Sequence, residues 1–295
     1  FYGIPASLDM APYIYVENDR VVEQPTARTP GIRDGGVFWR EGEMSPSFDF
    51  TDVLPNLTRK AVSVIEDHGR SRASQPLFLY FPLTAPHTPW MPVEEVVGKS
   101  GAGKYGDFTH QVDQTVGAVM SALERAGMAG NTLLIVTSDN GSDWRPEHID
   151  EFAHLSNGAL RGRKRDTWEG GHRVPFLARW PGKVKAGSTC EDPVCLVDLT
   201  ATAAEISGQK LGKGVGEDSE SFVPLLMGKK RPAGREAIVL HSADGMFVLR
   251  QGKWKYIEGQ GPGSGNYGKW PHVTGAAPGQ LYDMSNDLRE AKNLY

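Results

Sequence analysis

Apolar residues recur at spacings of three and four in two stretches of the chain, which predicts two amphipathic helices. The first stretch is Asp52–His68, with its stripe at Leu57, Ala61, Val62, Val64 and Ile65. The second is Asp107–Gly127, with its stripe at Val112, Val116, Val119, Met120 and Leu123. Gly127 supplies a glycine stop for the second helix. Each helix is expected to pack its apolar side on a sheet.

Short apolar runs between turn-forming residues predict the strands of that sheet. They are Leu77–Phe81, bounded by two prolines, then Thr132–Thr137 and Val174–Trp180, with a closing helix at Leu196–Ile206. A strand, a helix and a strand in that order imply a crossover unit and a largely parallel sheet. Functional loops of such a sheet gather at the carboxyl ends of its strands.

The carboxyl-terminal part has a different pattern, with three short strand-like runs separated by glycine turns. Ala237–His241, Met246–Arg250 and Lys253–Ile257 predict an antiparallel meander. The pattern therefore indicates an incomplete α/β domain over residues 1–207, a connector over 208–234 and a small antiparallel subdomain over 235–295. Within the last, the Gly/Pro-rich segment 259–279 is expected to be a mobile loop. The turn-rich first sixty residues are expected to run as a long surface excursion that ends in the first helix.

Composition and charge limit the possible partners. The chain has 295 residues, 39% of them hydrophobic, which is enough for one large domain and a small appendage. With 32 basic and 36 acidic residues the net charge is -4, so no global field attracts nucleic acid or an anionic membrane. Any anion must be held by a local pocket. The apolar runs are far shorter than the roughly 20 residues that span a bilayer, so no membrane anchor is expected.

The two cysteines carry little functional signal. Four residues separate Cys190 from Cys195, which matches neither a redox pair nor a zinc knuckle. Two structural thiols and a local disulfide both remain open, and a disulfide would favour an export compartment.

A candidate metal corner follows the strand at Thr132–Thr137. Asp139 and Asn140 offer a carboxylate and an amide oxygen side by side, both hard donors suited to calcium or magnesium. The alternative is an ordinary turn, because Asp-Asn-Gly is common turn chemistry.

Two further residues are candidates for contact with an anion. His87 lies between Pro86 and Thr88-Pro89, in a loop that the prolines stiffen, which favours a positioned side chain. The alternative is a surface histidine or one with its hydrogen bonds satisfied, which is the commoner role of a lone loop histidine. Lys164 lies in a basic cluster with glycines on both sides, which allow turns that bring one cation into a cleft. A fixed ammonium suits a tetrahedral oxyanion. The alternative for Lys164 is a solvated basic surface.

Taken together, these segments resemble the sulfatase family of the alkaline phosphatase superfamily. The resemblance is most specific in LRGRKRDTWEGGHRVP at Leu160–Pro175, then in the segments Thr132–Ser142 and Ala85–Trp90. It is looser in FYGIPASLDMAP at Phe1–Pro12 and LYDMSNDLREAKNL at Leu281–Leu294. It implies an α/β fold with a largely parallel central sheet flanked by helices, and a small carboxyl-terminal antiparallel subdomain.

The resemblance also implies roles for individual residues. Asp139 and Asn140 would be two ligands of one calcium ion, and His87 and Lys164 would contact the sulfate ester. Ser7 would match a further hydroxyl at the sulfate. In the family, a formylglycine made from Cys or Ser hydrates and attacks sulfur, and the hydrate later collapses to release sulfate. His87 or Lys164 would be placed to protonate the leaving oxygen.

Two more histidines lie near the basic cluster in sequence. His154 and His172 are the expected sugar contacts if the substrate is a sulfated saccharide, with Trp144 and Trp168 as candidate stacking surfaces. A structural role is the alternative for each of the four.

The sequence departs from the family at the nucleophile. The motif Cys or Ser, x, Pro or Ala, x, Arg is found nowhere in the chain, and neither cysteine has that pattern. The resemblance therefore predicts that the nucleophile and the remaining calcium carboxylates lie on an amino-terminal segment before Phe1.

The function expected from the resemblance is calcium-dependent hydrolysis of a sulfated carbohydrate or aryl sulfate, in a periplasmic or secreted protein. One alternative is a phosphomonoester or phosphonate ester hydrolase of the same superfamily, although two-metal phosphatases need more Asp and His ligands. The other is a non-catalytic binder of sulfated glycans.

Overall fold

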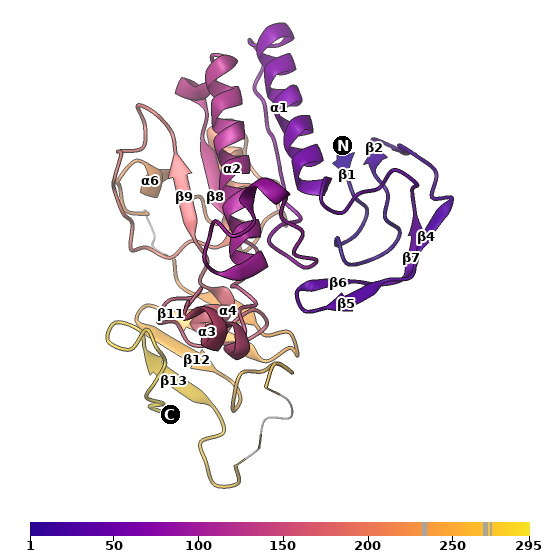
Figure 1. The fold of residues 1–295 in the computed structure, drawn as a ribbon. Helices are drawn as coiled ribbons and strands as arrows, with labels where there is room; N and C mark the ends of the chain where they lie inside the picture. The colour runs from indigo at the N-terminus through magenta and orange to yellow at the C-terminus, as the bar shows by residue number, and fades with distance from the viewer. Residues whose placement is uncertain (232–234, 268–270, 272) are drawn as a thin grey trace. The chain divides into compact units, whose positions relative to one another are not determined.

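The structure is a computed structural model that describes residues 1–231, 235–267, 271 and 273–295 (Figure 1). The chain divides into two compact units, Phe1–Asn131 and Thr132–Tyr295. Each unit has a hydrophobic cluster of its own. Among the described residues, no helix has both the length and the apolar character needed to cross a bilayer.

The two predicted long helices form the first unit's scaffold. They are α1 (Val53–Ser71) and α2 (Gly103–Arg125), which lie side by side in Figure 1 and contact each other. Of the predicted stripes, Leu57, Ala61 and Ile65 of α1 and Val119 and Leu123 of α2 are buried. The 3-10 turns η1 (Glu94–Val96) and η2 (Ala129–Asn131) flank α2. Gly127 has a φ of +69°, and the next residue, Met128, donates its N–H to the Leu123 carbonyl at 2.9 Å. The predicted glycine stop is thus confirmed as a C-cap.

The expected helix follows from Val53, but the segment before it is more than a surface excursion, because it has strands and a buried cluster. Its seven short strands are β1 (Tyr2–Gly3), β2 (Val16–Glu17), β3 (Arg20–Val21), β4 (Ala27–Thr29), β5 (Ile32–Asp34), β6 (Val37–Trp39) and β7 (Gly42–Met44). Tyr13, Phe48 and Phe50 pack into one buried cluster with Leu8 and Val53. Burial of aromatic side chains therefore stabilises this amino-terminal segment. Its frequent turns interrupt the strands too often for a hydrophobic periodicity to show in the sequence.

The run Leu77–Phe81 is not a strand in the structure, which corrects another prediction. It runs without strand pairing, and Phe78 and Tyr80 are 83% and 75% exposed. A strand needs a neighbour to satisfy its backbone groups, and the described residues place none beside this run.

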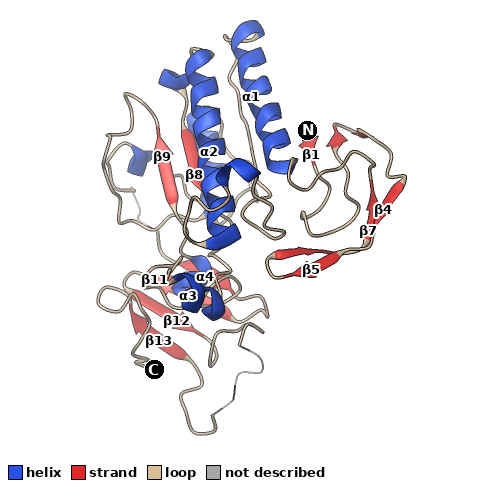
Figure 2. Ribbon diagram, viewed as in Figure 1, coloured by secondary structure: helices blue, strands red, loops and turns tan. Residues whose placement is uncertain are grey.

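The second unit begins with an antiparallel strand pair. In Figure 2 the strands β8 (Leu134–Thr137) and β9 (Phe176–Arg179) run side by side, with Thr137 opposite Phe176. Every ladder between named strands of the described residues is antiparallel, so the expected parallel sheet is not found there. The helical segments of this unit are α3 (Pro146–Phe152), α4 (Glu169–His172), η3 (Leu196–Asp198), α5 (Leu199–Ile206) and α6 (Val223–Leu226).

The carboxyl-terminal strands form one antiparallel sheet in the order β10-β11-β12-β13. The strands are β10 (Ile238–His241), β11 (Phe247–Gln251), β12 (Trp254–Ile257) and β13 (Gln280–Asp283), and the first three match the predicted runs. Trp168 packs against Val248, Ile257 and Tyr282 of this sheet. The loop before α4 is thereby fixed to the sheet.

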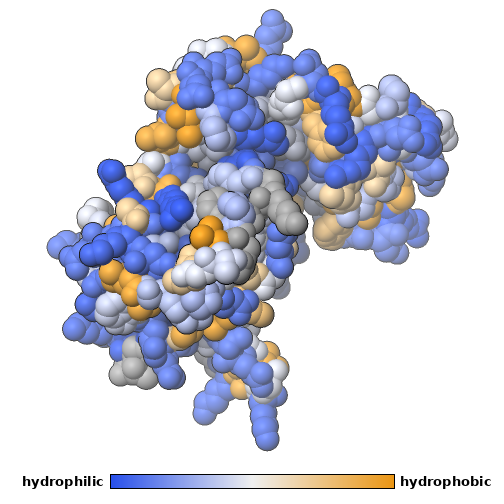
Figure 3. All heavy atoms as spheres, turned by 90° about the horizontal axis from the view of Figure 1, so that it is seen from below, coloured by the Kyte–Doolittle hydropathy of each residue, from blue (hydrophilic) through white to orange (hydrophobic). Residues whose placement is uncertain are grey.

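Part of the Gly/Pro-rich segment 259–279 is well packed, so the expectation of a loop that buries little was wrong there. Gly261, Pro262 and Ser264 are buried. Residues 268–270 and 272 of that segment, and residues 232–234 of the expected connector, lie outside the described residues. Cys190 and Cys195 are free thiols. On the face shown in Figure 3, polar side chains predominate and apolar ones form small separate groups.

Candidate active site

His87 lies in a loop of the first unit, and a neighbouring residue of that loop packs against the helices α1 and α2. Ala85 is buried against Leu54 of α1 and Phe108 of α2, while His87 itself is exposed. The His87 Nδ1 lies 2.8 Å from the Thr88 carbonyl oxygen. Because a carbonyl only accepts, Nδ1 carries the proton and Nε2 is the atom left for a ligand.

Ser7 lies near His87 through a shared neighbour, Asp9. The Asp9 carboxylate is buried and pairs with Arg40 Nη1 at 2.5 Å. Burial raises the pKa of Asp9, but the Ser7 hydroxyl, the Arg40 guanidinium and the charge of His87 lower it, and the net direction is down. Ser7, Asp9 and His87 therefore form one local group within this unit.

The second unit brings the Asp139-Asn140 corner and the Lys164 loop together through backbone hydrogen bonds. Lys164 N–H donates to the Ser142 carbonyl at 2.9 Å, and Gly141 N–H donates to the Gly171 carbonyl at 3.0 Å. A Cβ on Gly141 would lie 1.7 Å from the Gly170 carbonyl oxygen. Only glycine permits this approach, which explains the glycines on both loops.

The corner has the donor chemistry of a calcium site, but not enough donors for a complete one. Asp139 is exposed, and Asn140 donates its amide N–H to the Gly141 carbonyl at 3.0 Å, which leaves its side-chain oxygen for a cation. Calcium takes six to eight oxygens. The described residues contain no cluster of three or more His, Cys, Asp or Glu suited to a metal. Asp139 and Asn140 could thus supply part of a calcium shell.

The basic cluster is not a uniform solvated surface. Arg163 pairs with Asp143 at 2.6 Å, and the Arg161 guanidinium lies 3.7 Å from the centre of the Trp168 ring. Lys164 is half-buried, and the part of the chain that the structure describes places no carboxylate within ion-pair distance of its ammonium. Two arginines are therefore structural, while Lys164 keeps an uncompensated charge.

A buried ion triad fixes the segment that follows the lysine loop. The Lys255 ammonium is fully buried and lies 3.0 Å from Glu169 and 2.7 Å from Glu290. Glu290 also accepts the backbone N–H of Glu169 at 2.6 Å. Burial raises the pKa of Glu290. Burial also raises the pKa of Glu169, but Lys255 outweighs it, so the net direction there is down.

The two histidines expected to contact sugar lie in different environments. His154 is exposed, and its carbonyl accepts the Trp144 indole N–H at 2.7 Å. His172 ends α4, and burial, with the nearby Lys255 charge, lowers its pKa to about 4. Trp144 and Trp168 are both buried, so neither indole offers a free stacking face.

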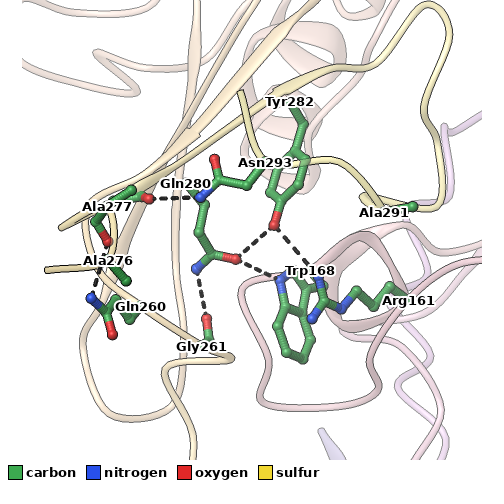
Figure 4. Close-up of a pocket in the computed structure, with 11 residues that line it drawn as sticks. Arg161, Trp168, Gln260, Gly261, Ala276, Ala277, Gln280, Tyr282, Ala291 and Asn293 are labelled. Carbon is green, nitrogen blue, oxygen red and sulfur yellow. Dashed lines mark hydrogen bonds between the residues drawn. The ribbon is translucent and has the colours of Figure 1, made fainter. Parts of the chain in front are cut away.

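A cavity of about 240 Å³ lies beside the Trp168 ring (Figure 4). Gln280 is at its centre: its side-chain oxygen accepts from Trp168 Nε1 at 3.0 Å and from the Tyr282 hydroxyl at 2.8 Å. Its amide nitrogen donates to Gly259 and Gly261. The polar groups bind each other, so the cavity is a structural feature of the sheet.

The structure thus brings Asp139, Asn140 and Lys164 together in one unit and Ser7 and His87 in the other. Sequence reasoning missed the residues that hold them: Asp9, Asp143, Asp166, Glu169, Lys255 and Glu290. The one visible signal was Asp166, an acidic residue that directly follows the basic cluster Arg161–Arg165.

Comparison with known proteins shows the family of the chain. The Sulfatase family model matches residues 48–208. The chain is 30% identical to N-acetylgalactosamine-6-O-sulfatase of Bacteroides thetaiotaomicron over 99% of its own length and 64% of that protein. It is 32% identical to bovine (Bos taurus) arylsulfatase A over 86% of the chain and 50% of that protein. The chain therefore spans less than two thirds of the length of these relatives.

Solved structures give the same result. A sulfatase from work on glycosaminoglycan metabolism by Bacteroides thetaiotaomicron superposes with a TM-score of 0.80 at 29% identity, covering 99% of this chain and 68% of that one. The i-CgsB protein in complex with k-i-k-neocarrahexaose gives a TM-score of 0.67 at 27% identity, covering 82% and 50%. These matches show an α/β sulfatase fold. The chain belongs to the sulfatase family.

Proposed function

We propose that this chain is part of a sulfuric ester hydrolase that releases inorganic sulfate, with Lys164, His87 and Ser7 contacting the ester. The observation that carries the proposal is the Lys164 ammonium, which pairs with no carboxylate of the described residues and lies on a loop hydrogen-bonded to the segment after the Asp139-Asn140 corner. A fixed cation there would stabilise the charge that builds on the departing oxygen. His87, with Nδ1 committed to Thr88, would present Nε2 to the substrate.

Asp139 and Asn140 would hold part of the calcium shell, and the ion would neutralise sulfate oxygens when bound. The nucleophile, a formylglycine, and the remaining ligands would lie on an amino-terminal segment before Phe1. Two observations support this: the absence of the modification motif from the sequence, and the exposed run Leu77–Phe81, which such a segment would cover as part of a largely parallel sheet.

The substrate class we favour is a sulfated carbohydrate, with an aryl sulfate second. One relative is an N-acetylgalactosamine-6-O-sulfatase and a structural neighbour holds a neocarrahexaose, whereas another relative is an arylsulfatase. Exposed His154 is the sugar contact that this proposal favours; partly buried His172 is the weaker candidate. A polymeric substrate of this kind also fits a periplasmic or secreted location.

We further propose that residues 235–295 form a carboxyl-terminal part joined to residues 1–207 through 208–234.

The first test is the intact mass of the natural protein with a peptide map of its amino-terminal region. A formylglycine on a segment before Phe1 is the expected result. A natural protein of 32.2 kDa would contain no nucleophile, and the non-catalytic binding function would replace hydrolysis.

The second test compares Lys164→Ala with Lys185→Ala in the intact protein. Lys185 is exposed, so its loss controls for removal of one positive charge. We expect Lys164→Ala to lower kcat on para-nitrophenyl sulfate by about 10²-fold or more, with Lys185→Ala at the wild-type value. Asp139→Ala and calcium chelation should each have the same effect as Lys164→Ala. Wild-type turnover by Lys164→Ala would remove that residue from the site.

A further inference from the structure

A buried carboxylate organises the loop that carries Lys164. Asp166 is fully buried, and four neutral donors reach its two oxygens. Oδ2 accepts from the Arg163 N–H at 2.9 Å and the Tyr267 hydroxyl at 3.0 Å. Oδ1 accepts from the Asn266 amide at 3.0 Å and the Ser264 hydroxyl at 2.5 Å. Three of the four donors belong to the segment Ser264–Tyr267 of the carboxyl-terminal region.

The same segment holds the backbone of Lys164. Asn266 Nδ2 donates to the Lys164 carbonyl at 2.7 Å, while the Lys164 N–H donates to Ser142 at 2.9 Å. Both peptide groups of the lysine are therefore tied, one to the carboxyl-terminal segment and one to the metal corner. A lysine with a fixed backbone has only its own side-chain torsions left to set the place of its ammonium.

The next residue shows how strongly this loop is constrained. Arg165 has a φ of +85°, a region that non-glycine residues occupy only when their surroundings impose it. Its carbonyl accepts the Ala243 N–H at 3.0 Å, and the N–H of Thr167 donates to the Pro262 carbonyl at 2.8 Å. The carboxyl-terminal region thus contacts the loop on both sides of Asp166.

We propose that Ser264–Tyr267, acting through Asp166, is a positioning element for the Lys164 ammonium, and that Asp166 and Asn266 are positioning residues. The inference rests on the proposed function, in which Lys164 contacts the sulfate ester. A displacement of about 1 Å at a catalytic group can lower a rate by about 10²-fold. Loss of the hydrogen bonds from this segment should therefore lower kcat.

The decisive variant is Asn266→Asp in the intact protein, with Asn286→Asp as its matched control. In the first, an acceptor replaces the amide that serves both Asp166 and the Lys164 carbonyl. Asn286 is exposed, and within the described part of the chain its amide donates to the neighbouring Ser285 hydroxyl and to nothing in the Lys164 loop, so the same chemical change there leaves the loop intact.

Two readouts are needed, because a purely structural role would lower stability alone. For Asn266→Asp we expect kcat on para-nitrophenyl sulfate to fall by about 10-fold to 100-fold, with KM within about threefold of wild type, at a temperature where the variant is folded. The melting temperature should also fall, because a carboxylate then faces the buried Asp166 carboxylate. We also expect faster acylation of Lys164, measured by mass spectrometry relative to Lys185 in the same sample. Asn286→Asp should match wild type in both.

A kcat and a Lys164 acylation rate at wild-type values in Asn266→Asp would overturn the proposal. If that variant does not fold, Tyr267→Phe, which removes one donor to Asp166, is measured in the same way, and wild-type values there also overturn it. If the wild-type protein hydrolyses no sulfate ester, the proposed function fails, and the acylation rates alone decide whether this segment positions Lys164.

Discussion

At the scale of single residues, burial separates two histidines that look alike in the sequence. His172 has a pKa of about 4 because burial disfavours its charged form, whereas His154 is exposed. A neutral ring at the end of α4 can accept or donate one hydrogen bond at neutral pH, but it offers no charge to a sulfate.

His172 should make the stability of the protein depend on pH. Its folded pKa lies below the unfolded value near 6.5, so the unfolded state binds the extra proton between pH 6.5 and 4. The contribution is complete above pH 6.5 and is lost as pH falls to 4, by about 3 kcal/mol. We expect the melting temperature of His172→Gln to depend less on pH between 6.5 and 4 than that of the wild type. Exposed His154→Gln is the control, and an equal slope in wild type and His172→Gln would contradict the assignment.

The residues that hold the candidate site could not be predicted from local patterns. Three of the four donors to Asp166 lie 98 to 101 residues further along the chain, and Lys255 pairs with Glu169 across 86 residues. Pairings at such separations depend on tertiary packing, which single-sequence periodicity does not report. Lys164, Asp139 and Asn140 could be named as candidates from their residue types, but only the family resemblance favoured a site over an ordinary turn and a solvated basic surface.

At the scale of elements, the helices were predictable and one strand was not. The stripes of α1 and α2 repeat every three to four residues and need no partner to be recognised. Leu77–Phe81 has the composition of a strand, yet pairing decides whether it becomes one, and pairing is not local. The runs predicted at β8, at β9 and in the carboxyl-terminal meander do pair with neighbouring strands, so those strands are confirmed.

The contact between the metal corner and the lysine loop gives a prediction at this scale. Gly141→Ala would place a methyl group against the Gly170 carbonyl, so we expect a loss of about 1–3 kcal/mol in the free energy of unfolding. Gly117→Ala is the matched control, because Gly117 lies within α2 with open space around its Cβ position. That change should be neutral or stabilise by up to about 1 kcal/mol. Urea unfolding of both variants gives the two free energies of unfolding. Equal values for Gly141→Ala and Gly117→Ala would refute the close packing at Gly141.

At the scale of the whole molecule, the proposed amino-terminal segment can be tested by hydrogen exchange. The backbone of Leu77–Phe81 has no strand partner within the described residues, so its amides should exchange fast in the 295-residue chain. In the intact protein we expect the same amides to be protected, because a neighbouring strand would bind them. The amides of α1 serve as an internal reference in both samples. Fast exchange in the intact protein would argue against a covering segment.

The exposed Phe78 and Tyr80 also bear on how this chain behaves at high concentration. An uncharged aromatic run of high strand propensity is a template for intermolecular cross-β stacking. Pro76 and Pro82 stand at its two ends, where proline, which lacks a backbone N–H, cannot extend a ladder. The two prolines should therefore limit cross-β pairing at this run to its five residues.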